Sequence, residues 1–247
     1  HVAVRRQRQM CIRDRDNYRV NGTKIWTTDA HRNDYIICLV RTLPAEENRH
    51  AGLSQIIIDL KRDGAKVRPI KNMAGGEDFN EVVFEDVVVP KDRIVGEAGN
   101  GWAQVTSELA FERSGPERFL SAFRVFVELV RFCGPEPTQY QATVIGRIAS
   151  HIMTLRRMSI SVAGMLESGK DVVVEAALVK ELGNNFEKLL PELARVVGSD
   201  GFSDFSRDGD LFRRTFEDTM LLSPSFTLRG GTREILRGVI ARGLGLR

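Results

Sequence analysis

The hydrophobic positions in the first third of the chain follow the two-residue period of β-strands. Short runs rich in Val and Ile alternate with polar or Gly-bearing turns from Tyr18 to about Pro90. Asn21-Gly22 separates the first two runs, and this pair favours a two-residue hairpin because both positions tolerate positive φ. The pattern predicts a small β-barrel or sandwich with strands YRV, TKIWTT, YIICLVR, LSQIIIDL, AKVRPI and EVVFEDVVVP.

From about Gly99 the apolar positions recur at helical spacing instead. Neither an internal repeat nor a low-complexity tract is evident in the sequence. The chain is therefore predicted to be an α+β protein, with a β domain over 16–97 and a helical bundle over 98–247. The five segments with long apolar faces are GWAQVTSELAFER, RFLSAFRVFVELVRFC, TVIGRIASHIMTLRRMSISVAGMLESG, DVVVEAALVKELGNNFEKLLPELARVVG and TREILRGVIARGL.

The composition is that of a globular protein with a sizeable core, since 42% of the 247 residues are hydrophobic. No apolar run approaches the roughly 20 residues of a membrane helix, and no secretory signal is evident. Cys11, Cys38 and Cys133 are odd in number and scattered. They favour reduced thiols, and hence a cytoplasmic location, over a disulfide framework.

Basic residues are concentrated at the N-terminus. Residues 1–15 contain five Arg and one Asp, a net charge of +4, so the remainder of the chain is close to −1. The overall charge of +3 therefore gives no reason to expect a nucleic-acid partner. This segment lacks hydrophobic periodicity and is interpreted as an atypical tail, an assembly artefact or a frame-damaged end, with a basic partner-binding arm as the alternative. The fold prediction leaves it out.

The histidines do not predict a metal site. His1, His31, His50 and His151 are far apart, and none lies in a Cys/His cluster or an HExxH arrangement. The sequence also contains no GxSxG, Walker A or GxGxxG string. Hydrolase and nucleotide-loop interpretations therefore have no direct support.

Glu112 lies on a predicted helix face that it shares with apolar residues. Val105 and Leu109 precede it by seven and three positions, which places all three on one side. Removing a carboxylate from water is costly. Glu112 is therefore either paired, with Arg113 or another partner, or it has a raised pKa that suits proton abstraction. The spacing alone favours the arginine-paired interpretation.

Trp26 presents a similar choice. In a strand, Trp26 and Thr28 point to one face and Thr27 points to the other. An indole beside a hydroxyl could flank a planar cofactor, although the pattern alone favours an indole that packs in the core.

A Gly-Gly-Thr stretch precedes the last predicted helix. Gly230 and Gly231 permit close backbone approach, and Thr232 stands where the helix begins. Backbone N–H groups there could meet a phosphate, or the turn is merely tight. Arg233, Arg237 and Arg242 are expected to be solvated or to make subunit contacts.

Taken together, these stretches resemble the acyl-CoA dehydrogenase family. The match covers about residues 16–247 in order and spacing. It is carried by NGTKIWTTDAHRNDYIICLVRT (21–42), GAKVRPIKNMAGGEDFNEVVFEDVVVPKDRIVGEAGNGW (64–102), ELAFER (108–113) and RGGTREILRGVIARGLGLR (229–247).

The resemblance implies a flavin enzyme with an N-terminal helical domain, a middle β domain and a C-terminal four-helix bundle. This chain corresponds to the second half of the small middle β-barrel followed by the bundle. The N-terminal helical domain and the strand resembling TEP-x-AGSD are missing from it. The chain alone is therefore expected to hold FAD poorly.

The implied reaction is α,β-dehydrogenation of an acyl-CoA thioester, with the α proton taken by a carboxylate and hydride passed to flavin N5. Electrons would then pass to an electron-transfer flavoprotein. By this resemblance, Trp26, Thr27 and Thr28 contact FAD from the β domain, and Thr232 and Glu234 contact it from the bundle.

Many family members carry the base directly before the GT pair, where this chain has Gly230. The isovaleryl- and long-chain-type enzymes place it before an Arg on the first bundle helix, which matches Glu112 and Arg113 here. The resemblance thus implies Glu112 as the base, with Arg113, Gly230 and Gly231 contacting substrate.

Two stretches depart from the family pattern. The usual R-x-x-FG…Q stretch is not evident in RFCGPEPTQYQATVIGR (131–147), and GGxG appears only as VGSDGF (197–202). They leave open a non-catalytic or partner-dependent subunit of a hetero-oligomer. A related flavin oxidase or monooxygenase is a further alternative, and the oligomer is either homomeric or heteromeric.

Overall fold

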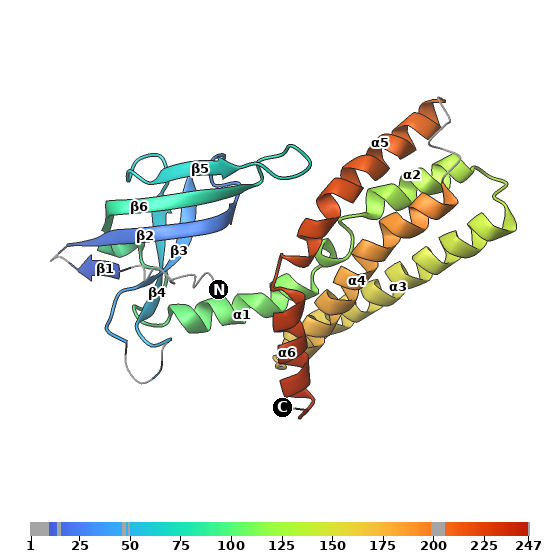
Figure 1. Ribbon diagram of the computed structural model, residues 1–247. Helices are drawn as coiled ribbons and strands as arrows, with labels where there is room; N and C mark the ends of the chain where they lie inside the picture. The colour runs from blue at the N-terminus through green and yellow to red at the C-terminus, as the bar shows by residue number, and fades with distance from the viewer. Residues whose placement is uncertain (1–9, 14–15, 46–47, 49, 199–205, 247) are drawn as a thin grey trace. The chain divides into compact units, whose positions relative to one another are not determined.

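The computed structural model describes residues 10–13, 16–45, 48, 50–198 and 206–246 (Figure 1). The chain forms two compact units, residues 1–107 and 108–247, each of which is described by itself. The fold is mixed, with strands in the first unit and helices in the second, as the sequence predicts. In the described part of the chain, no helix is both long and apolar enough to cross a lipid bilayer.

The first unit contains a six-stranded sheet of order β4-β3-β1-β2-β6-β5. All neighbouring strands are antiparallel except β1 and β3, which are parallel. A short 3-10 turn, Lys91–Arg93, follows the sheet. The strands are β1 (Met10–Arg13), β2 (Asn17–Thr28), β3 (Tyr35–Arg41), β4 (Leu53–Asp59), β5 (Lys66–Ile70) and β6 (Phe79–Pro90).

The period-two pattern of the sequence accounts for the core of this unit. Alternate side chains are buried in β3, in most of β6 and in the first part of β2, while the intervening ones are more exposed. The buried core includes Tyr18, Val20, Cys38, Val40, Ile56, Ile58, Val82, Phe84, Val87 and Val89. The sheet ends at Pro90, in agreement with the prediction.

The predicted hairpin at Asn21-Gly22 is wrong. Both residues lie within β2, which runs without a turn from Asn17 to Thr28. Gly22 has a φ of +139°, but it uses this freedom at a register shift against β6, not at a chain reversal. Asn21 bridges the same irregularity, because its amide donates to Asp86 Oδ1 at 3.0 Å and its oxygen accepts from the Asp86 N–H at 2.8 Å.

Four residues of the segment left out of the fold prediction belong to the sheet. Met10–Arg13 forms β1 and pairs with β2 from Met10 opposite Asn21 to Arg13 opposite Tyr18. The remainder of the predicted tail, residues 1–9 and 14–15, lies outside the described residues.

The second unit is a helical bundle in which α2, α3, α4 and α5 lie side by side (Figure 1). Helix α6 packs against α4. The division between the units falls within α1, after Ser107. The helices are α1 (Gly101–Ser114), α2 (Phe123–Cys133), α3 (Gln139–Glu167), α4 (Val173–Val197), α5 (Arg207–Leu222) and α6 (Arg233–Gly243), with 3-10 turns at Pro116–Arg118 and Ser223–Thr227.

Helix α5 is not among the five predicted helices. Its sequence is dominated by charged residues, so it has little overall hydrophobicity. Phe212 and Phe216 nevertheless lie one turn apart and are buried against the rest of the bundle, and Phe212 stacks on Phe132 of α2 at 5.4 Å between ring centroids. These two aromatic side chains bury a large apolar area, and Met220 and Leu222 of the same helix pack against the core beside them.

Two other predicted helical features need correction. Residues 118–122 do not extend α2, which begins at Phe123. They belong instead to the 3-10 turn Pro116–Arg118 and the connection after it. In α1, the predicted apolar face is at most half-buried at Val105 and Leu109, and the buried residues near its end are Arg113 and Ser114.

Replacing Phe212 by Ala is expected to lower the free energy of unfolding by about 3–5 kcal/mol, because the ring is fully buried between α5 and α2. Urea denaturation measures the change. Leu221→Ala serves as the control on the same helix, since Leu221 is 44% exposed and its removal should cost less than about 1 kcal/mol. Equal losses in the two variants would contradict the packing of α5.

Candidate active site

The carboxylate of Glu112 is paired with Arg118. Its Oε1 accepts a hydrogen bond from Arg118 Nη2 at 2.6 Å, and its main-chain oxygen accepts one from Arg118 Nε at 2.8 Å. The Glu112 side chain is 42% exposed, whereas that of Arg118 is only 10% exposed. Glu112 is therefore an arginine-paired carboxylate, as the spacing favours, but its hydrogen-bonded partner is Arg118 and not the adjacent Arg113.

Gly230 lies directly against this ion pair. It has a φ of +67°, in the left-handed region that favours glycine. A Cβ at this position would lie 3.7 Å from Glu112 Oε1 and 3.5 Å from Arg118 Nε. The two positions that the sequence offers for a catalytic carboxylate, Glu112 and Gly230, thus converge in space.

Arg113 holds the glycine turn in place. Its Nε donates to the main-chain oxygen of Gly230 at 3.0 Å, and a Cβ on Gly231 would lie 3.5 Å from its Nη2. Burial lowers the pKa of Arg113, while the nearby charge of Glu112 acts in the opposite direction. The structure thus brings together Glu112, Arg113, Gly230 and Gly231, all four from the second unit.

Helix α4 contributes a row of buried polar residues that the sequence analysis missed. Lys180, Asn184 and Glu187 lie four and three positions apart and have no solvent exposure. Their signal in the sequence is a set of polar residues at helical spacing inside an otherwise apolar helix. The row is hard to see in the sequence, because a polar residue in an amphipathic helix is ordinarily expected at the border between its apolar and solvent-exposed faces.

Glu187 links the two segments that form the site. Its Oε1 accepts from the backbone N–H of Ser121 at 2.9 Å, and its Oε2 lies 3.7 Å from Arg229 Nη2. Arg229 also donates to the Ser121 hydroxyl at 2.7 Å. Ser121 lies three residues after Arg118, and Arg229 directly precedes Gly230. This carboxylate therefore joins the two segments that carry the neighbours of the Glu112 carboxylate.

Lys180 is a buried neighbour of Glu187, Arg229 and Arg118. Its ammonium donates to the main-chain oxygen of Phe226 at 3.1 Å. Burial lowers the pKa of Lys180 to about 8, against the raising effect of Glu187, and Arg229 and Arg118 lower it further. A buried amine of this kind titrates at a pH where most lysines remain charged.

The start of α6 is fastened to α4 through Glu181. Its Oε1 accepts from Arg233 Nη2 and from Arg237 Nε, each at 3.0 Å. Burial raises the pKa of Glu181, but the hydrogen bonds from the two arginines outweigh it and lower the pKa below its ordinary value. Arg233 is therefore mostly turned to Glu181, whereas Arg237 keeps 63% of its side chain exposed beside its bond to Glu181 and Arg242 is exposed, as expected of a solvated face.

Thr232 occupies the N-cap position of α6, as predicted, but its side chain makes no capping hydrogen bond to the backbone. Its hydroxyl lies near the carboxylate of Glu234 instead. The pKa of Glu234 is lowered by its own backbone N–H and by this hydroxyl. Thr232 and Glu234 thus form a small polar group in the first turn of the helix.

Trp26 is located in the first unit, on a β-bulge of β2. The register shifts between Lys24 and Thr27, and Trp26 has a φ of +64°, which is strained for a bulky residue. Its indole is 62% exposed and meets Phe79 edge-on at 6.2 Å between ring centroids. The core-packing interpretation of Trp26 is therefore wrong. Thr28 is also exposed, whereas Thr27 is half-buried.

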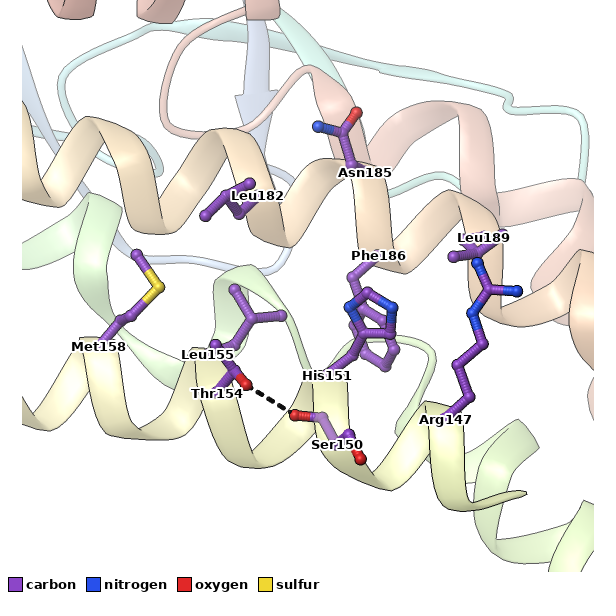
Figure 2. A pocket seen from close by; sticks show the side chains of 10 residues that line it. All are labelled: Arg147, Ser150, His151, Thr154, Leu155, Met158, Leu182, Asn185, Phe186 and Leu189. Carbon is purple, nitrogen blue, oxygen red and sulfur yellow. Dashed lines mark hydrogen bonds between the residues drawn. The ribbon is translucent and has the colours of Figure 1, made fainter. Parts of the chain in front are cut away.

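A separate groove of about 540 Å³ lies between α3 and α4 (Figure 2). Arg147, His151 and Leu155 line it from α3, and Leu182 and Phe186 line it from α4. None of the predicted site residues lines this groove. Within the described residues, no group of three or more His, Cys, Asp or Glu side chains could hold a metal ion.

Comparison with known families identifies both units. The model of the acyl-CoA dehydrogenase middle domain matches residues 5–87, and that of the acyl-CoA dehydrogenase C-terminal domain matches residues 99–245. The chain belongs to the acyl-CoA dehydrogenase family. Members of this family are flavoprotein oxidoreductases of lipid metabolism.

Among its relatives is the acyl-CoA dehydrogenase IpdE1 of Mycobacterium tuberculosis, which is 32% identical over 238 residues, 94% of this chain and 60% of that protein. The chain therefore spans about three fifths of this curated relative.

Solved structures of the family share the fold. The ChsE4-ChsE5 complex from Mycobacterium tuberculosis has a TM-score of 0.78 at 26% identity, covering 98% of this chain and 65% of that chain. The steroid acyl-CoA dehydrogenase Tcur3481-Tcur3483 has a TM-score of 0.82 at 23% identity, covering 98% and 64%.

The titration of Lys180 is expected to make stability depend on pH. Between about pH 8 and 10 the folded protein binds fewer protons than the unfolded chain, whose lysine keeps its ordinary pKa, so this group raises stability as pH rises. The free energy of unfolding of the wild type relative to Lys180→Met should therefore increase by about 1–2 kcal/mol from pH 7.5 to 9.5.

Urea denaturation at several pH values measures this difference. Lys188→Met is the matched control, because Lys188 lies on the same helix and is exposed. The difference between the wild type and this control variant should stay flat over the same range. A flat or falling difference for Lys180→Met would contradict the lowered pKa of Lys180.

Proposed function

We propose that the complete protein is an FAD-dependent acyl-CoA dehydrogenase in which Glu112 removes the α proton of an acyl-CoA thioester. The observation that supports it most directly is the position of the Glu112 carboxylate, partly exposed and in contact range of the bare backbone at Gly230. Membership of the family supplies the reaction class. The proposal concerns the whole protein, because this chain covers 60% of the length of the relative IpdE1.

The chemistry requires a carboxylate that is both oriented and reachable. Arg118 engages Oε1 of Glu112, while nearly half of the side chain remains accessible. A base fixed in this way starts close to its productive geometry, which favours proton transfer. Gly230 leaves room at the carboxylate, because a side chain there would occupy the space beside Oε1.

FAD would supply the acceptor for the hydride that leaves the β carbon. The exposed indole of Trp26, held on a strained bulge, fits contact with a planar ring system. Thr27 and Thr28 follow it on the same strand. In the bundle, Thr232 and Glu234 offer a hydroxyl and a carboxylate at the start of α6. We assign these five residues to FAD binding, and Arg113, Gly230 and Gly231 to the substrate side.

The partners follow from the same assignment. The acyl-CoA thioester is the substrate, and an electron-transfer flavoprotein is the proposed acceptor of the electrons. The second candidate is a partner-dependent subunit of a hetero-oligomeric dehydrogenase. It is favoured by the likeness to a chain of the ChsE4-ChsE5 complex, which contains two different proteins. Retention of FAD only after co-expression with a second dehydrogenase chain would distinguish this candidate from a self-sufficient enzyme.

Glu112→Gln in the complete protein is expected to retain flavin. The rate at which acyl-CoA bleaches the flavin absorbance under anaerobic conditions should fall at least about 100-fold, because an amide cannot accept the α proton. Stopped-flow absorbance with a panel of straight-chain and branched acyl-CoA thioesters measures the rate. Glu108→Gln is the control, since Glu108 lies one turn earlier on α1 and is exposed. Unchanged bleaching in Glu112→Gln would remove Glu112 from the role of base.

Moving the carboxylate should restore part of the activity. In a Glu112→Gly, Gly230→Glu double variant, the new side chain starts 3.7 Å from the place of Glu112 Oε1, so we expect bleaching about tenfold faster than in Glu112→Gly alone. The recovery is partial because a non-glycine residue at positive φ is strained.

The matched control for this exchange is Glu112→Gly with Gly231→Glu, in which the new side chain would face Arg113 instead. It should recover nothing. Equal recovery from both double variants, or none from either, would show that the convergence of Glu112 and Gly230 has no catalytic meaning.

A further inference from the structure

Arg118 contacts Glu112 at two separate points. Nη2 donates to the carboxylate at 2.6 Å, and Nε donates to the main-chain oxygen of the same residue at 2.8 Å. The second bond satisfies one of the carbonyls that the end of a helix leaves without a partner. The first bond is not needed for that purpose. A single planar guanidinium thus fixes both the backbone and the carboxylate of one residue.

The burial of the two partners is unequal. Arg118 is buried, and its other acidic neighbour, Glu117, lies farther away at 3.6 Å and is 55% exposed. A buried guanidinium needs a charged partner, so pairing with Glu112 is the favoured conformation of the Arg118 side chain. The glutamate remains reachable from outside while its orientation is set from within.

The backbone of Arg118 is itself held rigidly. It ends the 3-10 turn that Pro116 begins, and its N–H donates to the oxygen of Gly115 at 3.1 Å. Helix α4 comes so close at Gly183 that a Cβ there would lie 2.5 Å from the Arg118 oxygen. The next residue, Phe119, is buried in the core of the bundle. The guanidinium is therefore attached to a part of the fold that has little freedom to shift.

We infer that Arg118 is a positioning residue that orients the Glu112 carboxylate for proton abstraction from the acyl-CoA thioester. This inference rests on the proposed role of Glu112 as the base. Arg118 itself touches neither substrate nor cofactor in this assignment. It acts through Oε1 of Glu112, and it requires the fork geometry of arginine, because the single ammonium of a lysine cannot hold both the carboxylate and the carbonyl at the same spacing.

The test compares Arg118→Met and Arg118→Lys in the complete, flavin-loaded protein. The probe is the thioester of the panel that bleaches the wild type fastest. We expect the maximal bleaching rate to fall about 100-fold in Arg118→Met and about tenfold in Arg118→Lys, while the thioester concentration at half-maximal rate changes less than threefold. Exchange of the α protons for deuterium in D₂O, followed by mass spectrometry, should slow by the same factors. Arg124→Met, an exposed arginine on α2, is the matched control.

A merely structural arginine would give a different result. Loss of flavin content or of melting temperature in both Arg118 variants, with an unchanged rate per bound flavin, would overturn the inference. If Arg118→Met does not fold, Arg118→Lys alone tests the inference: its maximal bleaching rate and its α-proton exchange rate should both fall about tenfold relative to the wild type, and unchanged rates would overturn it. Bleaching that survives Glu112→Gln refutes the proposed base, whereas bleaching that is lost in Glu112→Gln but kept in both Arg118 variants refutes only the positioning role.

Discussion

The arrangement of the site depends on the buried carboxylate of Glu187. It has no solvent exposure, so its charge must be met by polar or charged groups inside the protein. One is a donor, the backbone N–H of Ser121, and the other is a charge partner from a distant part of the chain, the guanidinium of Arg229 at 3.7 Å. Bringing them to one oxygen pair fixes the turn that carries Arg118 and the turn that carries Gly230. Glu112 and Gly230 lie close together at the ends of the two segments that Glu187 joins.

Helix α4 serves as the frame on which the bundle side of the site is assembled. Glu187 faces the connection between α1 and α2, while Glu181 binds the two arginines at the start of α6. Gly183, between them, allows the backbone at Arg118 to approach closely. The polar residues of α4 therefore bind two different segments, the connection after α1 and the start of α6. The apolar face of α4 packs in the same core as α2, α3 and α5. Stability and site geometry consequently depend on the same element.

The β unit stores strain at the residue that the family resemblance assigns to the flavin. Trp26 adopts a positive φ on a bulge and exposes most of its indole, both of which are unfavourable for an isolated strand. The neighbouring pairs of β2 and β6 hold this conformation on either side of the register shift. Core packing within this unit does not account for a strained, exposed aromatic residue.

The sequence by itself determined the class of the fold, the strands from β3 to β6, most of the helices, and the candidate status of Glu112. These follow from periodicity and from local motifs, which depend on neighbours along the chain. The sequence predicted a turn at Gly22, although a positive φ is equally suited to the bulge that the structure has there. It missed α5 because the many charged residues of that segment conceal the apolar spacing of its two buried phenylalanines. Only the tertiary structure decided that Arg118 pairs with Glu112, that Glu187 anchors both turns, and that Gly230 meets Glu112 across 118 positions. The reason is physical: a buried charge takes its partner from whatever segment the packing brings near, and no spacing along the chain records that choice.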